Sequence, residues 1–120
     1  MLTQKFAFPK SRRLIRPAEF DAVKKGGQVQ RGKLMMLSVL VVEPGKTFRA
    51  GFVTSRKIGS AVVRNRVRRR LRDIVRKHQH EIVGGKWIVT IARVHSRVAA
   101  YRELEDEWLR LAGRASILAP

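Results

Sequence analysis

The spacing of apolar and polar residues along the chain predicts seven regular elements. Apolar residues recur at a helical period near the start, in the middle and near the end, and short, almost continuous apolar runs between them are typical of buried strands. The elements follow the order α-β-β-β-α-β-α over residues 17–25, 28–31, 34–42, 49–55, 60–80, 87–92 and 98–111. This order predicts an α+β sandwich, built as a single domain from residues 1–120 with a basic lead-in over 1–12 and a short tail over 113–120.

Turn and capping residues predict where these elements begin and end. Pro17 suits the first turn of a helix, and Glu19 is favourable near the positive end of that helix. The sequence Glu43-Pro44-Gly45 predicts a turn, after which residues 49–55 would return as a strand antiparallel to the one before. Ser60 is a candidate N-cap of the long central helix.

Charge is distributed unevenly along the chain. There are 27 Lys and Arg against 9 Asp and Glu, which gives a formal net charge of +18. Residues 1–80 carry 21 basic and 4 acidic residues, whereas residues 81–120 carry 6 and 5. Such asymmetry predicts a basic face for a polyanion, with nucleic acid as the first candidate and an acidic membrane surface as the second.

Other compositional features narrow the class of protein. The chain has no cysteine, which excludes disulfides, thiolate zinc sites and a cysteine nucleophile. The longest apolar run, residues 34–42, is too short to cross a bilayer, and the N-terminus lacks the apolar core of a signal peptide. These features predict a soluble, cytoplasmic protein.

Half of the net charge lies in the central helix and the residues just before it. Ten basic residues and one acid occur from Arg56 to Lys77. The apolar stripe that anchors this helix is predicted at Val63, Val67, Leu71 and Ile74. A helix that serves only solubility mixes opposite charges at i,i+4, whereas here arginines stand beside arginines and would repel one another without a polyanion. Arginine also suits bidentate phosphate contacts and stacking on bases.

The segment from Gly51 to Arg72 carries a resemblance to a known family. Its sequence, GFVTSRKIGSAVVRNRVRRRLR, closely resembles the signature of the bacterial ribonuclease P protein component, whose core is here Arg64-Asn65-Arg66. The similarity extends over about residues 8–112, nearly the whole domain. The resemblance implies the same α+β fold, with a four-stranded, mostly antiparallel sheet and a left-handed βαβ crossover.

The resemblance also implies a function. Proteins of this family assist a catalytic RNA, which holds the Mg²⁺ ions of the reaction and removes the 5′ leader from precursor tRNA. That RNA and the precursor tRNA would be the partners, with no obligate protein partner, and the protein would supply no catalytic residue and no metal ligand. The RNA contacts would be Arg56, Lys57, Arg64, Asn65, Arg66, Arg68, Arg69, Arg70, Arg72 and Arg76. A cleft between the sheet and the first helix would bind the single-stranded leader through Phe20, Lys24 and Arg13, with Phe20 as a stacking platform.

Two positions depart from the family pattern. Many relatives place a second aromatic residue where this chain has Lys24, and they often place a tyrosine in the first long strand, where it has leucine or methionine around Leu37. Both differences predict a cleft that binds the leader more through charge and less through stacking. Phe20 is open to two interpretations, leader platform or core residue, and Phe52 fits a core strand better than an RNA contact.

The residues give little support to an enzyme that acts alone. His78 and His80 diverge on a helix and His95 is isolated, so the spacing of a zinc site is lacking. The core stripe of the last helix is expected at Tyr101, Leu104, Trp108 and Leu111. The acidic residues of that helix are expected mostly to face solvent, or to match the basic face: Glu103, Glu105, Asp106 and Glu107. The alternatives to a ribonuclease P protein are a ribosomal protein or assembly factor, a DNA-architectural protein and a stand-alone nuclease.

Overall fold

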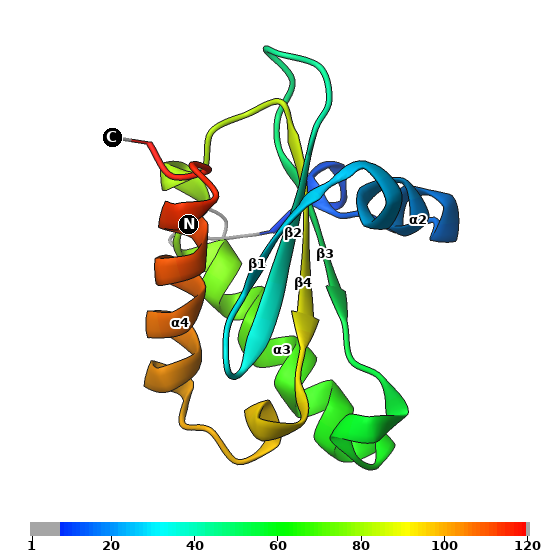
Figure 1. Ribbon diagram of the computed structural model, residues 1–120, viewed down its shortest axis with the longest axis vertical. Helices are drawn as coiled ribbons and strands as arrows, with labels where there is room; N and C mark the ends of the chain where they lie inside the picture. The colour runs from blue at the N-terminus through cyan, green and yellow to red at the C-terminus, as the bar shows by residue number, and fades with distance from the viewer. Residues whose placement is uncertain (1–7, 120) are drawn as a thin grey trace.

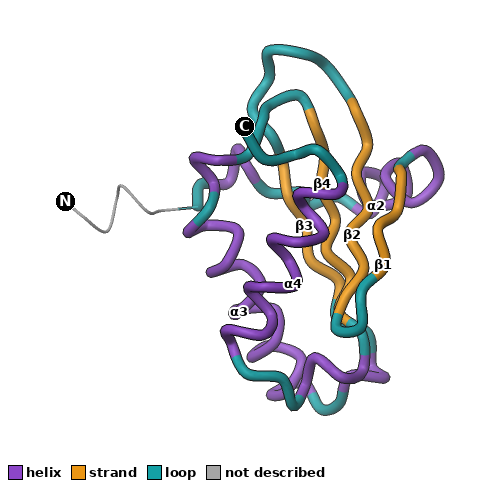
Figure 2. Tube along the Cα trace, turned by 60° about the vertical axis from the view of Figure 1, so that its left-hand side comes forward, coloured by secondary structure: helices purple, strands orange, loops and turns teal. Residues whose placement is uncertain are grey.

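A four-stranded sheet runs through the middle of the molecule and separates the helices into two layers (Figures 1 and 2). The computed structural model describes residues 8–119. The strands are β1 (Gln28–Arg31), β2 (Met35–Val41), β3 (Arg49–Val53) and β4 (Lys86–Ala92). One face is covered by α2 (Pro17–Gly26), and the other by α3 (Ala61–Lys77) and α4 (Tyr101–Arg114). Within residues 8–119, the 3₁₀ turn η1 (Lys10–Arg12) precedes α2, and three more lie between later elements: η2 (Arg56–Ile58), η3 (Gln79–Glu81) and η4 (Val94–Arg97). The predicted order of helices and strands is confirmed.

The sheet differs from the predicted one in a single pairing. Its strand order is β1-β2-β4-β3. β2 pairs antiparallel with β1 and with β4, whereas β3 pairs parallel with β4. The expectation that β3 returns alongside β2 is therefore wrong, because β4 lies between them. Parallel neighbouring strands cannot be joined by a tight turn. The connection from β3 to β4 therefore runs through α3 over one face of the sheet, which forms the βαβ unit that the resemblance implies.

Two apolar clusters hold the layers together. The larger lies between the sheet and the α3–α4 layer and includes Met35, Leu37, Ile88, Leu104 and Trp108. The smaller lies beneath α2 and is built on Leu14, Val23 and Val89. Successive residues of a strand face opposite sides, so Leu37 enters the larger cluster while the Ser38 hydroxyl donates to the carbonyl oxygen of Val23 in α2 at 3.4 Å. The strand is thus covered on both faces, and its predicted burial is confirmed at its central residues.

Both ends of the described chain are tied into the fold. Phe8 is buried, and its ring stacks on Phe48 with 6.2 Å between the centroids. Ile117 is fully buried, and Leu118 forms a β-bridge with Ile82. Part of the predicted lead-in and tail therefore belongs to the core. Residues 1–7 of the lead-in and the last residue of the tail lie outside the described residues.

One acidic residue of α4 corrects the expectation that these side chains mostly face solvent. Glu107 is buried, and its carboxylate accepts hydrogen bonds from the backbone N–H groups of Lys33, Leu34 and Met35, which lead into β2. The reason is its place on the helix, because position 107 lies three residues after Leu104 and therefore on the apolar stripe. The expected core stripe itself is confirmed, with Tyr101 half-buried and the other three residues fully buried.

Candidate nucleic-acid interface

Helix α3 is anchored by one face and presents its other faces outward. Val67, Leu71 and Ile74 are buried as the stripe predicts, and Val63 packs at the edge of the same cluster. The predicted N-cap is also present, because the Ser60 hydroxyl accepts from the N–H of Val63 at 3.3 Å. An apolar stripe on one side leaves the arginine side chains of the helix on the solvent side.

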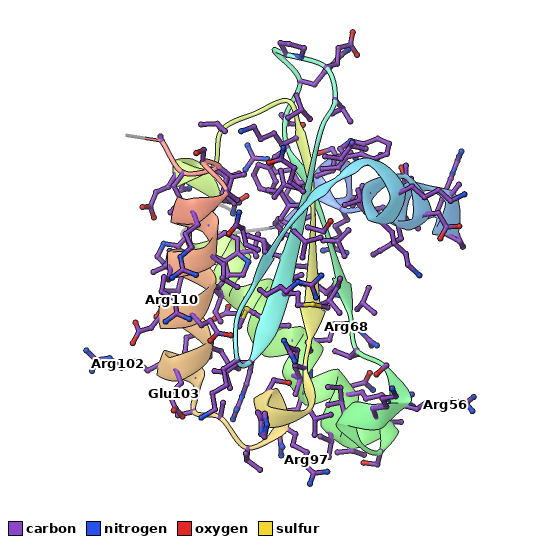
Figure 3. The ribbon with its side chains drawn as sticks, viewed as in Figure 1. Arg56, Arg68, Arg97, Arg102, Glu103 and Arg110 are labelled. Carbon is purple, nitrogen blue, oxygen red and sulfur yellow. The ribbon has the colours of Figure 1, made fainter. Side chains whose placement is uncertain are left out.

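The chain enters α3 through η2, which holds Arg56 and Lys57 in solvent while Ile58 is buried beneath them. Gly59 follows with φ of +148°, a backbone conformation that residues with a side chain rarely adopt. Figure 3 shows Arg56 pointing away from the body of the protein at this end of α3. Two cations therefore stand beside the positive end of a long helix, where the first backbone N–H groups also favour phosphate.

On the side facing α4, two arginines of α3 brace the segment that leads into α4. Arg66 donates to the carbonyl oxygen of Arg97 at 3.0 Å, and Arg70 donates to that of Ala99 at 3.3 Å. A guanidinium has five N–H donors, so both arginines keep donors for a ligand. These predicted RNA contacts therefore also have a structural role.

On the side facing β3, Arg68 links the helix to the sheet. It donates to Thr54 Oγ1 at 2.6 Å and to Asn65 Oδ1 at 2.9 Å, and Figure 3 shows it lying inside the outline of the protein. Near the C-terminal end of the helix, Arg76 forms an ion pair with Asp73. Asn65 and Arg76, both predicted RNA contacts, therefore also have partners within the protein.

The other predicted contacts on this segment carry charge without an internal partner. Among residues 8–119, the predicted RNA contacts whose side chains make no hydrogen bond or ion pair are Arg56, Lys57, Arg64, Arg69 and Arg72. Their full sets of donors remain available, and an ionised donor makes the stronger kind of hydrogen bond to phosphate.

A pocket of about 250 Å³, here called the arginine pocket, lies between η1, the start of α2, β3 and α3. Four cations and no acid line it, together with apolar side chains: Lys10, Arg13, Arg68 and Arg72, with Leu14, Ile15, Phe20, Ala50, Gly51 and Phe52. Partial burial and the like charges of Arg13 and Arg68 lower the pKa of Arg72. Arginine remains protonated at neutral pH even so, and positive charge is therefore concentrated here without a protein anion to balance it.

A second hollow of about 420 Å³, here called the α2 cleft, lies between α2 and the sheet. Its lining is mostly apolar and comprises Phe20, Asp21, Val23, Lys24, Val29, Arg31, Met36, Ser38, Val53, Val89 and Ile91. Two of the three residues predicted for the leader, Phe20 and Lys24, thus share this cleft. Arg13 does not line it and belongs to the arginine pocket.

Phe20 lies where the two hollows meet. It lines both of them and also packs against the cluster beneath α2. Its ring rests on Gly51 of β3, where a Cβ atom would come within 2.5 Å of the ring. The ring is therefore a core contact on one side and a wall of both hollows on the other. Phe52 packs against the larger cluster, as expected, and also lines the arginine pocket.

Sequence reasoning missed several residues of these hollows. Lys10 of the arginine pocket could have been predicted from the sequence, because it belongs to the basic lead-in three residues before Arg13. Met36 of the α2 cleft could also have been predicted, since the strand residues adjacent to a core residue face the opposite side of the sheet. The guanidinium of Arg31 lies 3.8 Å from Met36 Sδ. The place of Arg31 in the cleft could not have been predicted from the sequence, because it depends on the pairing of β1 with β2, which is a tertiary contact.

Comparison with known proteins agrees with the motif. The family model described as Ribonuclease P matches residues 8–116. The chain belongs to the ribonuclease P protein family. The ribonuclease P protein component of Acidothermus cellulolyticus is 39% identical over 109 residues, which cover 88% of this chain and 89% of that protein. The corresponding protein of Desulfovibrio desulfuricans is 37% identical over 114 residues, which cover 92% and 88%. The resemblance inferred from the signature is confirmed.

Solved structures of ribonuclease P proteins share the fold. The protein from Staphylococcus aureus matches with a TM-score of 0.84 and 24% identity, over 91% of this chain and 99% of that one. The protein from Thermotoga maritima matches with a TM-score of 0.76 and 25% identity, over 85% and 96%. The predicted fold class is therefore confirmed.

His78, at the end of α3, forms ion pairs within the fold. His78 lies between Glu81 and Glu105, at 2.6 and 2.8 Å. Burial acts to lower the pKa of His78, but the two carboxylates outweigh it and raise that pKa above its ordinary value. Glu105 also pairs with Lys77 at 2.8 Å, and so matches the basic helix internally, one of the two roles expected for these acids. Within residues 8–119, His, Cys, Asp and Glu form no group of three that could hold a metal ion.

No helix of the described range combines the length and the apolar character that a membrane span requires.

Proposed function

We propose that this chain is the protein component of the ribonuclease P endoribonuclease and acts in the cytoplasm in the removal of the 5′ leader from precursor tRNA. One observation carries the proposal. The arginine pocket, with four cations and no acid, adjoins the apolar α2 cleft, and Phe20 lines both. A charged pocket that continues into an apolar cleft with an aromatic wall suits a single-stranded nucleic acid, whose phosphates and bases need these two environments side by side.

The outer surface of α3 and the η2 turn would bind the catalytic RNA. Arg64 and Arg69 have no partner within the described residues, and Arg56 and Lys57 extend the same charge beyond the helix N-terminus. Guanidinium groups make bidentate contacts to phosphate and stack on unpaired bases. With about five phosphates neutralised, affinity should fall by roughly two to three orders of magnitude between 50 and 200 mM salt.

The α2 cleft would bind the leader. Phe20 offers a ring for stacking, Lys24 and Arg31 offer cations, and Asp21 gives the cleft one acid. The position where many relatives carry a second aromatic residue is Lys24 in this chain, and the cleft-facing residues of β2 are Met36 and Ser38. Stacking would therefore involve one ring, with charge contributing the rest. Arg13 would act on a leader phosphate from the arginine pocket rather than from the cleft.

The protein would assist the reaction without supplying its catalytic groups. When bound, Mg²⁺ activates the attacking water and stabilises the leaving oxygen, and we assign these ions mainly to the partner RNA. The residues described here offer no fitting cluster of carboxylates for them, so no step is assigned to a metal on the protein. The basic surface would neutralise phosphates where RNA and substrate meet, which lowers repulsion and favours Mg²⁺ binding by the RNA. The proposal requires no second protein.

The test is cleavage of a precursor tRNA by a bacterial ribonuclease P RNA at low Mg²⁺, with and without this protein, and with the protein alone as a control. Cleavage at the mature 5′ end only when both components are present supports the proposal. Binding to the RNA without rescue of cleavage contradicts it and favours the ribosomal alternative. Cleavage by protein alone would contradict the non-catalytic role.

A pair of variants tests the basic surface itself. Arg69→Ala removes an outward cation of α3, whereas Arg102→Ala removes an exposed cation of α4, which Figure 3 shows pointing away from the domain on the side of α4. Both variants change the net charge equally. Arg69→Ala should weaken RNA binding and Arg102→Ala should not; equal affinities would contradict the assignment of α3.

A further inference from the structure

A hollow on the far side of α3 from the α2 cleft forms part of the basic outer surface of α3 and is distinct from the arginine pocket and the α2 cleft. It has a volume of about 560 Å³ and lies between α3 and the start of α4. We call it the α3–α4 groove, and its lining is Val62, Arg66, Arg69, Arg70, Asp73 and Tyr101. Three cations, one acid, one aromatic ring and one apolar side chain thus share a single concave surface.

Exposed apolar side chains flank this groove. Among residues 8–119, the two most exposed large apolar side chains are Val98, at 79%, and Val62, at 75%. Val62 lines the groove. Val98 lies between Arg97 and Ala99, whose carbonyl oxygens are bound by the groove residues Arg66 and Arg70. Apolar side chains that are held in water beside arginines indicate a partner that is apolar in one part and anionic in another.

The aromatic ring of the groove is fixed before any partner arrives. The Tyr101 hydroxyl donates to Asp73 Oδ2 at 2.6 Å, and Lys77 Nζ lies 5.3 Å from the centre of the ring. Burial alone would raise the pKa of Asp73, but hydrogen bonds from Tyr101 and Arg76 outweigh it and lower that pKa. The carboxylate is therefore ionised at neutral pH. A ring held at both its hydroxyl and its face is pre-organised for stacking, which reduces the entropy lost on binding.

We propose that the α3–α4 groove binds one unpaired nucleotide of the partner RNA, and that this contact is separate from the leader cleft. The inference rests on the proposed function, because it takes that RNA as the ligand. The base would lie against Val62 and Tyr101, and its phosphate would bind Arg66 and Arg69. Unpaired bases are recognised by stacking on aromatic rings and guanidinium planes. The groove offers both, with the guanidinium groups on α3 and the ring on the first residue of α4.

The acid sets the orientation of the nucleotide. Asp73 repels a phosphate at its end of the groove, so the phosphate binds toward Arg66 and the base points toward Asp73 and Tyr101. A carboxylate has about four acceptor positions, and hydrogen bonds from Tyr101 and Arg76 fill three of them. The remaining position can accept one N–H of a base. Each of the four bases has such an N–H, an exocyclic amino group in adenine, cytosine and guanine and the N3–H in uracil, so this hydrogen bond orients the base without selecting its identity.

The experiment compares two substitutions of exposed valines in the full chain. Val62→Glu introduces a carboxylate into the groove, and the control Val41→Glu makes the same change at a residue 68% exposed, at the end of β2 remote from the start of α3. Each variant is bound to a transcribed bacterial ribonuclease P RNA, and the unpaired bases of that RNA are probed with dimethyl sulfate, kethoxal and a carbodiimide, which together report on all four bases. Val62→Glu should bind about tenfold more weakly and leave reactive an unpaired base that the natural protein protects. Val41→Glu and the conservative Val62→Leu should match the natural protein.

The outcomes separate this inference from the proposed function. If Val62→Glu binds as tightly as Val41→Glu, the groove does not bind the RNA, although the proposed function stands. If Val62→Glu binds more weakly but protects the same bases as the natural protein, its effect is electrostatic and the base site is refuted. If the natural protein itself does not bind the RNA, the proposed function fails and this inference fails with it.

Discussion

The carboxylate of Glu107 allows a direct test of how α4 is fastened to the sheet. Its Oε2 atom accepts from the N–H of Leu34 at 2.6 Å and of Met35 at 2.9 Å, and its Oε1 atom accepts from the N–H of Lys33 at 3.1 Å. Arg110 adds an ion pair from the solvent side at 3.1 Å. Replacing this residue therefore leaves three backbone donors at the start of β2 without their acceptor.

The size of the effect follows from the burial of those donors. Met35 is fully buried and Leu34 half-buried, whereas Lys33 is exposed and its N–H can turn to water. A hydrogen bond to a charged group contributes about 1.5–3 kcal/mol, and two such bonds cannot be replaced by solvent. Glu107→Ala should lower the free energy of unfolding by about 3–5 kcal/mol, and Glu107→Gln, which keeps one acceptor oxygen, by about 1–2 kcal/mol. The alanine variant would thus lose a large part of the stability of a small domain.

The assay is urea unfolding followed by circular dichroism. The control is Asp106→Asn, the same kind of substitution one residue earlier on the helix at an exposed position, with an expected change below about 0.5 kcal/mol. Glu107→Gln should move the midpoint clearly to lower urea while the slope stays the same. If both variants unfold at the same urea concentration, Glu107 does not fasten α4 to β2 and the reasoning is refuted.

Three further predictions concern the charged surface and the cleft. Arg72→Gln should leave the domain at least as stable in urea, because repulsion from Arg13 and Arg68 is relieved, yet reduce the salt slope of RNA binding by about 0.7–0.9; a clear loss of stability would contradict the repulsion. The raised pKa of His78 means that its ion pairs contribute their full stability below about pH 6.5 and less as pH rises through the raised pKa. The free energy of unfolding, measured in urea, should therefore change less between pH 6 and pH 9 in His78→Asn than in the natural protein. An equal change in both would exclude His78 as the cause. Gly51→Val should displace the Phe20 ring and weaken holoenzyme binding of precursor tRNA more than of mature tRNA, whereas equal losses would speak against a leader contact.

The local pattern of apolar and polar residues predicted the helices and strands, but it did not predict which strand pairs with β3. The start of α3 followed from Ser60 and its buried face from the apolar stripe, which are properties of neighbouring residues, whereas its end did not, because α3 stops at Lys77 rather than at the predicted residue 80. The pairing of β3 with β4 depends on contacts between segments more than 30 residues apart, and strand periodicity is the same whether a strand pairs with its predecessor or with a later strand. The resemblance to the family supplied the crossover that periodicity could not.

The candidate site was predictable to the extent that it lies on one helix. The periodicity of α3 separates its outward arginines from its buried stripe, so the basic surface could be derived from the sequence alone. The division into two hollows could not, because Lys10, Arg13 and Phe20 reach them from segments that meet only in the fold. Nor could the internal hydrogen bonds of Arg66, Arg68 and Arg70, whose acceptors include atoms in the loop after β3 and in the segment before α4.

The distribution of acids explains how a helix with so much charge can remain folded and still bind RNA. Asp73 pairs with Arg76, and Glu105 pairs with Lys77 and His78, so within the described residues the acids that pair with α3 act on its C-terminal third. Cations at that end also interact favourably with the helix dipole, which makes it the end where the fold is stabilised. The arginines from position 64 to position 72 have no acidic partner among residues 8–119, and Arg64 also lies in the first turn, near the positive end of the helix dipole. That half of the helix is electrostatically unfavourable in the free protein, and an RNA that supplies phosphates removes the repulsion on binding. The affinity for RNA and the local instability therefore have the same physical origin, and a substitution that relieves one should weaken the other.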